Sequence, residues 1–241
     1  MIYIQSDSDR IRPHHFDCAS AMYGAIETGQ DYRLTTYAEV ASGMFDSLLR
    51  NNLFVGSVEF MRLVYYRMGI DNVRLPANSN RTHYTSSLGE IKRQAKLGKK
   101  AFIKPYDIKL FTGFVIDQMQ HSSIQDIPDD TQIMVYDVFK YPIESEWRCY
   151  IHYNKVKYIG NYSGDLYVNI NGAYLESVIK ENSSNFPCAY TIDIGILSNG
   201  ENVVVEFNDM WAIGNYGVPN DLYLRMLKDR YFQVVRYSLD I

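Results

Sequence analysis

Three oxygen-bearing side chains late in the chain have the types and the spacing that bind a divalent cation. Asp193 and Glu206 lie in the two arms of a predicted hairpin, and Asn208 follows Glu206 by two positions. Two carboxylates opposed across a strand pair repel each other, and a cation bound between them converts that repulsion into coordination. Carboxylate and amide oxygens are hard ligands that suit Mg²⁺ or Mn²⁺ shared with a phosphate. The alternative is an ordinary pair of solvent-exposed acidic residues on a half-buried hairpin.

A loop in the middle of the chain carries groups that bind phosphate. Lys104 ends an apolar strand immediately before Pro105, and Lys109 begins a short loop that contains Thr112 and Gly113. The lysine charges and the backbone N–H groups of such a loop can hold a polyphosphate. A plain hairpin with two solvated lysines is the alternative. The sequence contains neither a P-loop nor a glycine-rich dinucleotide motif, so a nucleotide bound here requires another fold.

Arg148 is a further candidate for chemistry. It follows Glu146 by two positions in a segment after Pro142, and strand periodicity places both side chains on one face. Trp147 then lies on the opposite face and is predicted to be a core residue. An arginine held on a strand can grip a phosphate or a carboxylate with two hydrogen bonds. An exposed Arg–Glu pair is the alternative.

The hairpin that holds the two carboxylates is predicted from its turn. Asn199-Gly200 is the strongest short hairpin signal, because a type I′ turn needs positive φ at both central residues. This two-residue turn pairs Ser198 with Glu201, and counting outward puts Asp193 opposite Glu206. Alternation predicts an apolar face made of Ile192, Ile194, Ile196, Val203, Val205 and Phe207.

Strand and helix patterns alternate along the rest of the chain and predict an α/β (α+β) fold. Strands are predicted at residues 1–4, 31–36, 53–57, 101–104, 133–138 and 143–151. Helices are predicted at residues 11–30, 58–68, 88–97, 173–182 and 220–236. The polar segment 76–87 has the composition of a linker or surface loop. The predicted domains are therefore a small N-terminal lobe at residues 1–82 and a second region at residues 83–241.

The composition excludes several classes of protein. The chain of 241 residues is long enough to bury a sizeable core, and its net charge of −4 argues against a protein built mainly to hold a nucleic-acid backbone. No apolar run is long enough to span a membrane, and the N-terminus does not read as a signal peptide. These features predict a soluble, cytoplasmic protein with no membrane partner.

Three cysteines and two adjacent histidines raise the question of a zinc site. His14, His15 and Cys18 lie close together, but no fourth ligand follows at a recognisable spacing. Cys149 and Cys188 form no metal-spaced pair with each other. A structural or surface role is the better interpretation of this group.

The order of these motifs resembles that of the ATP-grasp superfamily. Across roughly residues 101–217 the chain has Lys-Pro, Phe-Thr-Gly, Ser-Glu-Trp-Arg and then, from Glu206 to Gly217, Glu-Phe-Asn-Asp-Met-Trp-Ala-Ile-Gly-Asn-Tyr-Gly. This pattern is similar to that of a small phage-associated and bacterial clade marked by two arginines and a lysine. The resemblance implies an ATP-grasp fold, in which a small N-terminal α/β lobe accompanies two α+β subdomains that enclose ATP.

The resemblance also implies a role for each candidate residue. Lys104 and Arg148 match the lysine and one arginine of the clade, whereas the second arginine stays open among Arg62, Arg81 and Arg93. Lys104 would contact the nucleotide, and Arg148 would grip the γ-phosphate or an acyl phosphate. The other implied nucleotide contacts are Lys109, Thr112, Gly113, Tyr136, Asp137, Val138 and Glu146. The implied Mg²⁺ ligands are Asp193, Glu206 and Asn208, and the implied acceptor pocket contains Asp209, Trp211, Gly214 and Tyr216.

The activity implied is that of a carboxylate–amine or carboxylate–thiol ligase. ATP phosphorylates a carboxylate of a small molecule or peptide, and an amine or thiol then displaces phosphate from the acyl phosphate. Two alternatives stay open. One is a covalent nucleotidyltransferase similar to RNA ligases. Its attacking lysine would lie in a Lys-x-Asp-Gly motif, whereas Lys104-Pro-Tyr-Asp107 has a different spacing and no following glycine. The other is a scaffold that binds ATP without chemistry.

Overall fold

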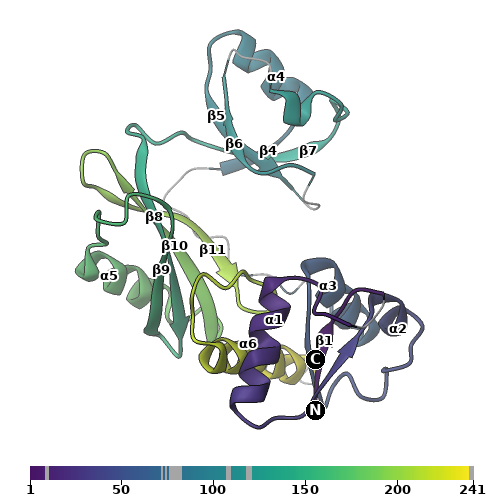
Figure 1. The fold of residues 1–241 in the computed structure, drawn as a ribbon. Coiled ribbons are helices and arrows are strands. Elements are labelled where there is room, and N and C mark those ends of the chain that lie inside the picture. Colours follow the sequence, from purple (N-terminus) through teal and green to yellow (C-terminus); the bar gives the residue numbers. More distant parts are fainter. Residues whose placement is uncertain are drawn as a thin grey trace. The chain divides into compact units, whose positions relative to one another are not determined.

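The computed structural model describes residues 1–8, 11–71, 73, 75, 83–106, 110–117 and 121–238 of the chain. Contacts divide the chain into two compact units (Figure 1): unit 1 is Met1–Asn78 with Glu144–Ile241, and unit 2 is Ser79–Ile143. The strands of unit 1 are β1 (Ile2–Gln5), β2 (Tyr32–Thr35), β3 (Leu53–Val55), β8 (Ile143–His152), β9 (Lys155–Gly164), β10 (Ala189–Leu197) and β11 (Asn202–Asp209). Its helices are α1 (Phe16–Glu27), α2 (Tyr37–Ala41), α3 (Val58–Arg67), α5 (Gly172–Asn182) and α6 (Asn220–Tyr237).

The N-terminal part of unit 1 is a small parallel sheet with the strand order β2-β1-β3. Every side chain of β1 is buried, as the apolar start of the chain predicts. Helix α3 begins after Ser57, whose hydroxyl accepts a hydrogen bond from the Phe60 amide, and Gly69 at φ +71° lies just beyond its end. The predicted strands and the predicted helix at residues 58–68 are confirmed here. The short helix α2 was not predicted, although Thr36 and Glu39 form a capping box at its start.

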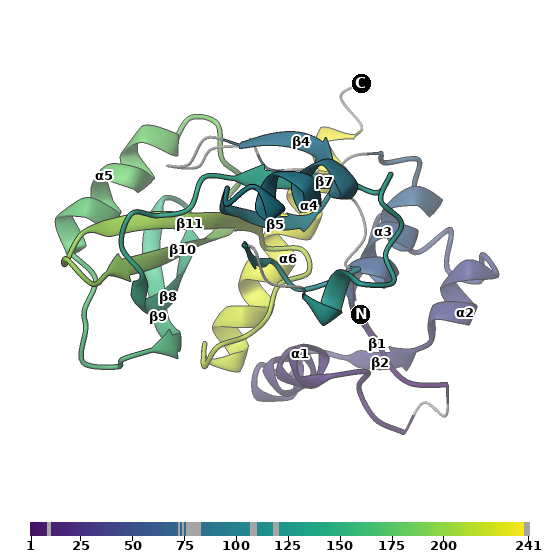
Figure 2. The ribbon, with the colours of Figure 1, turned by 90° about the horizontal axis from the view of Figure 1, so that it is seen from above.

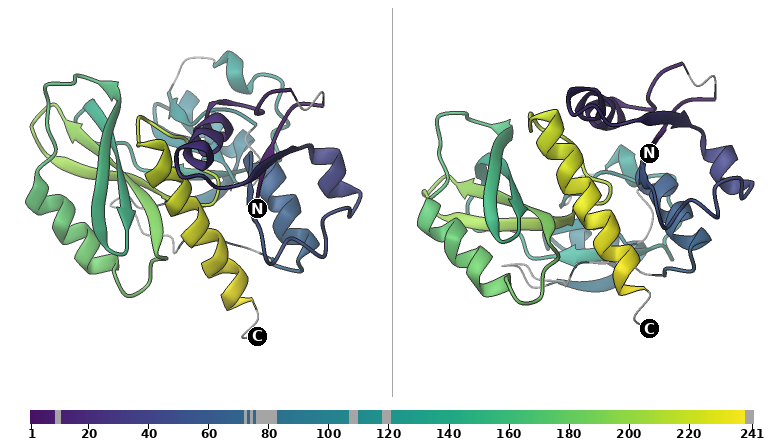
Figure 3. Two further views of the ribbon diagram at one scale, coloured as in Figure 1. Left: turned by 60° about the horizontal axis from the view of Figure 1, so that its bottom comes forward. Right: turned by 90° about the horizontal axis from the view of Figure 1, so that it is seen from below.

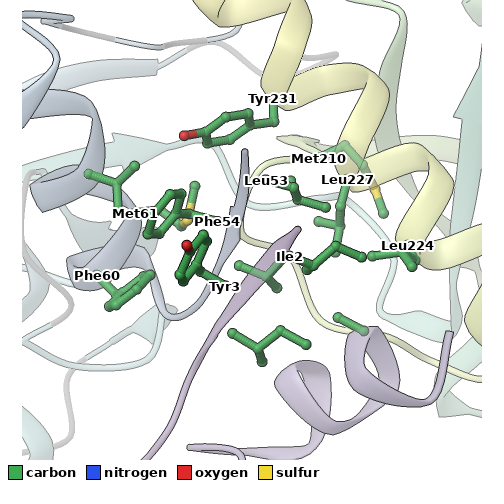
Figure 4. Close-up of a cluster of buried hydrophobic side chains, with 14 of the residues drawn as sticks. Ile2, Tyr3, Leu53, Phe54, Phe60, Met61, Met210, Leu224, Leu227 and Tyr231 are labelled. Carbon is green, nitrogen blue, oxygen red and sulfur yellow. The ribbon is translucent and has the colours of Figure 1, made fainter. Parts of the chain in front are cut away.

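The core of unit 1 joins the two ends of the chain. Ile2 of β1 and Leu53 of β3 belong to the same buried cluster as Leu227 and Tyr231 of α6 (Figure 4). Burial of these large apolar side chains is the main stabilising term, because each contributes about 1.5–3 kcal/mol relative to exposure. The closing helix therefore packs with the N-terminal sheet, and the compact units differ from the division at residue 82. That division stays a prediction about domains.

A second sheet of unit 1 has the strand order β11-β10-β8-β9, with antiparallel pairs β10–β11 and β8–β9. Helix α5 lies beside this sheet (Figure 2), and Leu175 and Ile179 pack with Ile151 of β8 and Ile192 of β10. Figure 3 shows α6 between this sheet and the N-terminal sheet. Trp147, predicted as a core residue, is only half-buried, and its indole N–H donates to the Val168 carbonyl at 2.9 Å.

The turn between β10 and β11 differs from its prediction. Only Gly200 has positive φ, at +85°, so a type I′ turn at Asn199-Gly200 is wrong. The Gly200 amide donates to the Leu197 carbonyl at 2.7 Å, and the Leu197 amide donates to the Glu201 carbonyl at 2.8 Å. Three residues therefore form the loop, and the glycine takes the left-handed conformation that follows a type I turn.

An irregularity further along the hairpin cancels the shift that the longer turn introduces. Near the turn Ile194 pairs with Val204, but beyond the irregularity Asp193 pairs with Glu206, which leaves Val205 as the extra residue of a β-bulge. The predicted pairing of the two carboxylates is confirmed, although the turn from which it was counted is wrong. The apolar face is corrected accordingly, because Val204 lies opposite Ile194 in place of Val205, and Asn202 lies opposite Ile196 in place of Val203.

Unit 2 is one antiparallel sheet with a helix and a core of its own. Its elements are β4 (His83–Ser87), α4 (Leu88–Lys96), β5 (Ala101–Pro105), β6 (Phe114–Ile116), the 3-10 helix η1 (Ser122–Ile124) and β7 (Gln132–Tyr136). The strand order is β4-β7-β5-β6, and Leu88, Ile103 and Ile133 are among the residues of its buried cluster. The predicted linker is wrong at residues 83–87, because this polar segment pairs with β7 as an edge strand. Ser87 caps α4, because its hydroxyl accepts a hydrogen bond from the Glu90 amide.

Among the helices that the structure describes, none combines the length and the apolar character needed to cross a membrane.

Candidate active site

A buried ion pair between β8 and β10 is the centre of the candidate site. Arg148 Nε donates to Asp193 Oδ1 at 2.8 Å, and the guanidinium Nη2 donates to Oδ2 at 2.7 Å. The two side chains are 8% and 1% exposed. The sheet order makes β8 and β10 neighbours, so strand pairing alone brings residues that are far apart in sequence into this bidentate contact.

Glu206 and Asn208 on β11 complete the cluster. The Asn208 amide nitrogen lies 3.1 Å from Glu206 Oε1 and 3.4 Å from Asp193 Oδ2. Glu206 Oε1 is also 4.0 Å from the Arg148 Nη2. The three predicted metal ligands therefore lie together, as the β10–β11 register predicts, and the neighbouring strand β8 adds the predicted phosphate-binding arginine to the group.

The electrostatics of the pair reflect its burial. Burial raises the pKa of Asp193 to about 6, while the hydrogen bonds and charge of Arg148 act in the opposite direction. Burial also acts to lower the pKa of Arg148, but the hydrogen bonds and charge of Asp193 prevail and raise it. The arginine is therefore permanently charged, and the cluster contains a fixed cation surrounded by oxygen atoms.

The donor set fits a magnesium ion. Glu206 and Asn208 share one strand face and carry carboxylate and amide oxygens, which are hard ligands that match Mg²⁺. The Asn208 amide presents its nitrogen to the two carboxylates here, so a half-turn of the amide group would bring its oxygen to a cation. Both oxygens of Asp193 face Arg148, but a carboxylate has further lone pairs that can reach a cation. Within the described residues, no group of three or more histidine, cysteine, aspartate or glutamate side chains is arranged to hold a metal. The candidate site has two carboxylates and an amide, so its third ligand is outside those residue types.

Two tyrosines lie against the guanidinium of Arg148. Its central carbon is 4.8 Å from the ring centroid of Tyr216 and 5.6 Å from that of Tyr162, and the two rings stack at 5.1 Å. The Tyr162 hydroxyl donates to Glu146, the predicted nucleotide contact on β8. Burial and the nearby Asp193 charge raise the pKa of Tyr162, so it remains a neutral donor. Cation–π contact of this kind holds the guanidinium plane in place.

The segment after β11, which contains the predicted acceptor residues, is tied to three elements. Tyr150 of β8 donates to the Gly214 carbonyl at 2.6 Å and accepts from the Tyr216 amide at 3.0 Å. The Asn215 backbone N–H donates to Asp17 Oδ1 of α1 at 2.7 Å. Tyr223 of α6 donates to the carbonyl of Ile213. Gly214 and Tyr216 are therefore held beside Arg148 by main-chain hydrogen bonds.

The other two predicted acceptor residues have different surroundings. Both oxygens of Asp209 accept from Arg230 at 2.6 Å, and both side chains of this pair are 8% exposed. Trp211 packs edge-on against Tyr65, and its buried indole N–H has no hydrogen-bond partner among the described residues. A role in the acceptor pocket stays a prediction for Asp209 and Trp211.

The remaining predicted nucleotide contacts belong to unit 2. Lys104 on β5 is partly buried, and its ammonium lies 5.1 Å from the ring centroid of Tyr136 at the end of β7. Thr112 is exposed, and Gly113 approaches β5 so closely that a Cβ there would lie 2.7 Å from the ring of Phe102. Asp137 and Val138 are exposed residues directly after β7. Lys109 lies outside the described residues.

The clade's second arginine is not placed by these contacts. Arg62 is exposed on α3, Arg93 is exposed and pairs with Glu90 on α4, and Arg81 lies outside the described residues.

Strand alternation predicts Tyr150 on the β8 face of Arg148, but no role in the site was predicted for it. The contacts of Tyr162 and Arg230 were missed. Tyr162 on β9 lies against Arg148 and Arg230 on α6 pairs with Asp209, and no local signal in the sequence shows those contacts.

Comparisons with known proteins place this architecture. With 9–11% sequence identity and TM-scores of 0.50–0.55, the chain is similar to the peptide-bound ATP-grasp ligase PsnB, to D-alanine–D-alanine ligase from Bacillus anthracis and to an ATP-grasp RimK domain protein from Sphaerobacter thermophilus. The matches cover 95–98% of this chain and 96–98% of those chains, and they show the fold alone. A comparison with curated proteins finds no matching relative.

The fold is thus that of an ATP-grasp protein. More particularly, the chain belongs to the second ATP-grasp domain family of the clade named for its two arginines and one lysine, and the model of that family matches residues 79–226. The resemblance found in the sequence is confirmed at the level of the family and the fold.

Proposed function

We propose that this protein is an ATP- and Mg²⁺-dependent ligase that joins a carboxylate to an amine or thiol through an acyl phosphate. The observation that carries the proposal is the group formed by Arg148, Asp193, Glu206 and Asn208 in a chain of the ATP-grasp family. It combines a fixed cation with oxygen ligands for a metal, which are the two requirements for handling a transferring phosphoryl group.

The residues of the cluster divide these tasks. Glu206 and Asn208 would hold Mg²⁺ together with Asp193, and the ion would supply positive charge to the phosphates of ATP. Asp193 also aims Arg148 by its two hydrogen bonds, so the guanidinium presents its remaining donors in a defined direction. Lys104, Thr112, Gly113, Tyr136, Asp137 and Val138 of unit 2 are proposed to contact the nucleotide.

In the proposed reaction a carboxylate oxygen attacks the γ-phosphorus of ATP, and ADP leaves. The acyl carbon of the resulting mixed anhydride is then attacked by the amine or thiol, and phosphate leaves. Arg148 stabilises the negative charge of the transferring phosphoryl group and of the departing phosphate. The carboxylate and acceptor are carried by small molecules or peptides, and the loop with Gly214 and Tyr216 positions the acceptor.

The nucleotide product tests the proposal. Purified protein is incubated with Mg²⁺, γ- and α-labelled ATP, and a panel of amino acids and dipeptides that serve as both carboxylates and amines. ADP and phosphate are the expected products, and they should be released in equal amounts when the mixture contains an acid that the enzyme couples. Release of AMP, or AMP retained on the protein after denaturing electrophoresis, would identify a nucleotidyltransferase. ATP binding with no turnover across the panel would identify a scaffold.

Glu206→Gln tests the metal site directly. The substitution keeps the size of the side chain but removes the charge that holds the cation, so we expect Mn²⁺-dependent ATP binding and turnover to fall by about 10²-fold or more. Glu201→Gln is the matched control, because Glu201 is exposed beside the turn of the same hairpin. Unfolding midpoints measured for both variants separate loss of metal from loss of fold. Undiminished turnover in Glu206→Gln would contradict the proposed site.

A further inference from the structure

His15 lies at the start of α1, next to Asp17, which bonds the loop that follows β11. His15 occupies the N-cap position of α1, where serine, threonine, aspartate and asparagine normally cap the helix with their side chains. The His15 side chain makes no capping hydrogen bond. The side chain is 40% exposed, and its Nδ1 lies 3.6 Å from Asp17 Oδ2. Helix capping therefore does not explain the histidine, and its ring is accessible.

Asp17 links this histidine to the candidate active site. One carboxylate oxygen faces His15, and the other accepts the Asn215 amide at 2.7 Å. Asn215 lies between Gly214 and Tyr216, and the Tyr216 ring is 4.8 Å from the guanidinium of Arg148. The imidazole is thus connected to Arg148, which we propose binds the acyl phosphate, through Asp17 and the acceptor loop.

The packing of α1 on α6 fixes this arrangement within unit 1. A Cβ on Gly24 would lie 2.3 Å from the carbonyl oxygen of Asn220, so the two helices approach each other closely at a glycine. Asn220 donates to Glu27 at 2.9 Å, and Lys228 donates to Gln30 at 3.1 Å. Figures 1 and 3 show α1 beside α6. Because α6 holds α1 near its C-terminal end and the Asn215 backbone holds Asp17 near its start, the start of α1 has a defined position relative to the loop.

We propose that His15 is a general base for the acceptor amine, with Asp17 as its positioning residue. This inference rests on the proposed ligase function. His15 Nε2 takes a proton from the acceptor ammonium, and the freed lone pair forms the new C–N bond at the acyl carbon. The C–O bond to phosphate breaks with its electron pair, and the second nitrogen proton passes to the departing phosphate. The Asp17 carboxylate stabilises the imidazolium that forms, in the way a carboxylate supports a catalytic histidine.

Hydroxylamine separates this role from a structural one. Hydroxylamine is largely unprotonated at neutral pH, so it captures an acyl phosphate without help from a base. The assay compares hydroxamate formation with amide formation by wild type, His15→Gln and His14→Gln, using the amino-acid and dipeptide panel as carboxylates and amines. His14 is the matched control, because its ring is 5.1 Å from that of His15 but pairs with Asp7.

The proposal predicts a selective defect. His15→Gln should lose about 10²-fold or more in kcat/KM for the amine, which is the usual contribution of a general base, and should keep the hydroxylamine rate within about twofold. His14→Gln should match wild type in both reactions. Asp17→Asn keeps an oxygen for the Asn215 amide but loses the charge, so it should reduce the amine reaction alone, by a smaller factor.

Three outcomes would overturn the assignment. An amine rate unchanged in His15→Gln would exclude the general base. Equal loss with both nucleophiles, in a variant with a wild-type unfolding midpoint, would make His15 a binding or structural residue. If the wild-type protein forms no hydroxamate and no amide in any mixture, the ligase function fails and the role of His15 fails with it.

Discussion

Unit 1 contains two buried arginine–aspartate pairs with nearly the same geometry. Arg148 holds Asp193 through Nε and Nη2 at 2.8 and 2.7 Å, and Arg230 holds Asp209 through the same two atoms at 2.6 Å. Each pair joins elements that are distant in sequence, and all four side chains are 8% exposed or less. Residue type, hydrogen-bond pattern and burial therefore do not distinguish them.

The residues around the two ion pairs do distinguish them. The first pair lies beside Glu206 and Asn208, whose oxygens can hold a cation, and beside the Tyr216 ring, which is 43% exposed. The second pair is closed by Gln233, whose amide oxygen accepts from both Arg230 and the Cys188 backbone. A buried ion pair alone contributes little net stability, so its role depends on the groups around it. We therefore propose a chemical role for Arg148 and Asp193 and a structural role for the contact between Arg230 and Asp209.

Removing the arginine of the closed pair should have the largest effect on stability. Arg230→Met leaves the Asp209 carboxylate buried without its partner, which costs about 3–5 kcal/mol in the free energy of unfolding. Urea denaturation followed by circular dichroism measures the loss. The double variant Arg230→Met, Asp209→Leu removes both charges and should recover most of it. A loss below about 1 kcal/mol in the single variant would show that the pair is not a structural element.

The first pair, Arg148 with Asp193, is here called the open pair. Its substitution should lower turnover more than it lowers the free energy of unfolding. Arg148→Lys keeps a positive charge beside Asp193 but loses the two-pronged grip, so we expect turnover to fall by about 10²–10³-fold, as when one transition-state donor is removed. The midpoint of urea unfolding should change much less than in Arg230→Met. Arg225→Lys is the control, since Arg225 is exposed on α6 and pairs with Asp221. Wild-type turnover in Arg148→Lys would remove the distinction between the two pairs.

The sequence was informative where local rules decide the structure. Alternation predicted the strands and the amphipathic helices, and Asn199-Gly200 located the hairpin that carries Asp193 and Glu206. Motif order predicted the family. These signals depend on neighbouring residues, and tertiary packing reinforces them in this fold.

Contacts between distant segments could not be predicted in the same way. Nothing near Asp209 in the sequence indicates that Arg230 on α6 pairs with its carboxylate. The polar strand β4 was interpreted as a linker, because its partner β7 lies far along the chain. The register of β10 and β11 was predicted correctly only because the bulge at Val205 offsets the longer turn. A bulge has no clear signal in a run of three valines.

Tyr150→Phe tests whether the loop beside the open pair depends on its hydrogen bonds to the Tyr150 hydroxyl. The variant removes one hydroxyl that bonds both the Gly214 carbonyl and the Tyr216 amide. Leaving these groups unsatisfied costs about 1–3 kcal/mol. Because the loop positions Tyr216 against Arg148, we expect a higher KM for the acceptor with little change in ATP affinity. Tyr158→Phe is the control on the neighbouring strand, since Tyr158 packs edge-on against Tyr150 at 6.1 Å. If ATP affinity changed as much as the KM for the acceptor, the effect would arise from the Arg148–Asp193 pair and not from the loop.

Gly200→Ala should have the smallest effect, and it tests what fixes the open pair. Gly200 has φ +85° at the hairpin turn, and an alanine there costs about 1–2 kcal/mol because its Cβ disfavours the left-handed conformation. Gly172→Ala is the matched control, because a Cβ there also meets no atom within 4 Å and its φ is not positive. Since the bulge at Val205 lies between the turn and Asp193, the pairing of Asp193 with Glu206 should persist despite the strained turn. We therefore expect a lower urea midpoint with unchanged Mg²⁺-dependent turnover. Loss of turnover in proportion to stability would mean that the turn, and not the bulge, sets the register of the two carboxylates.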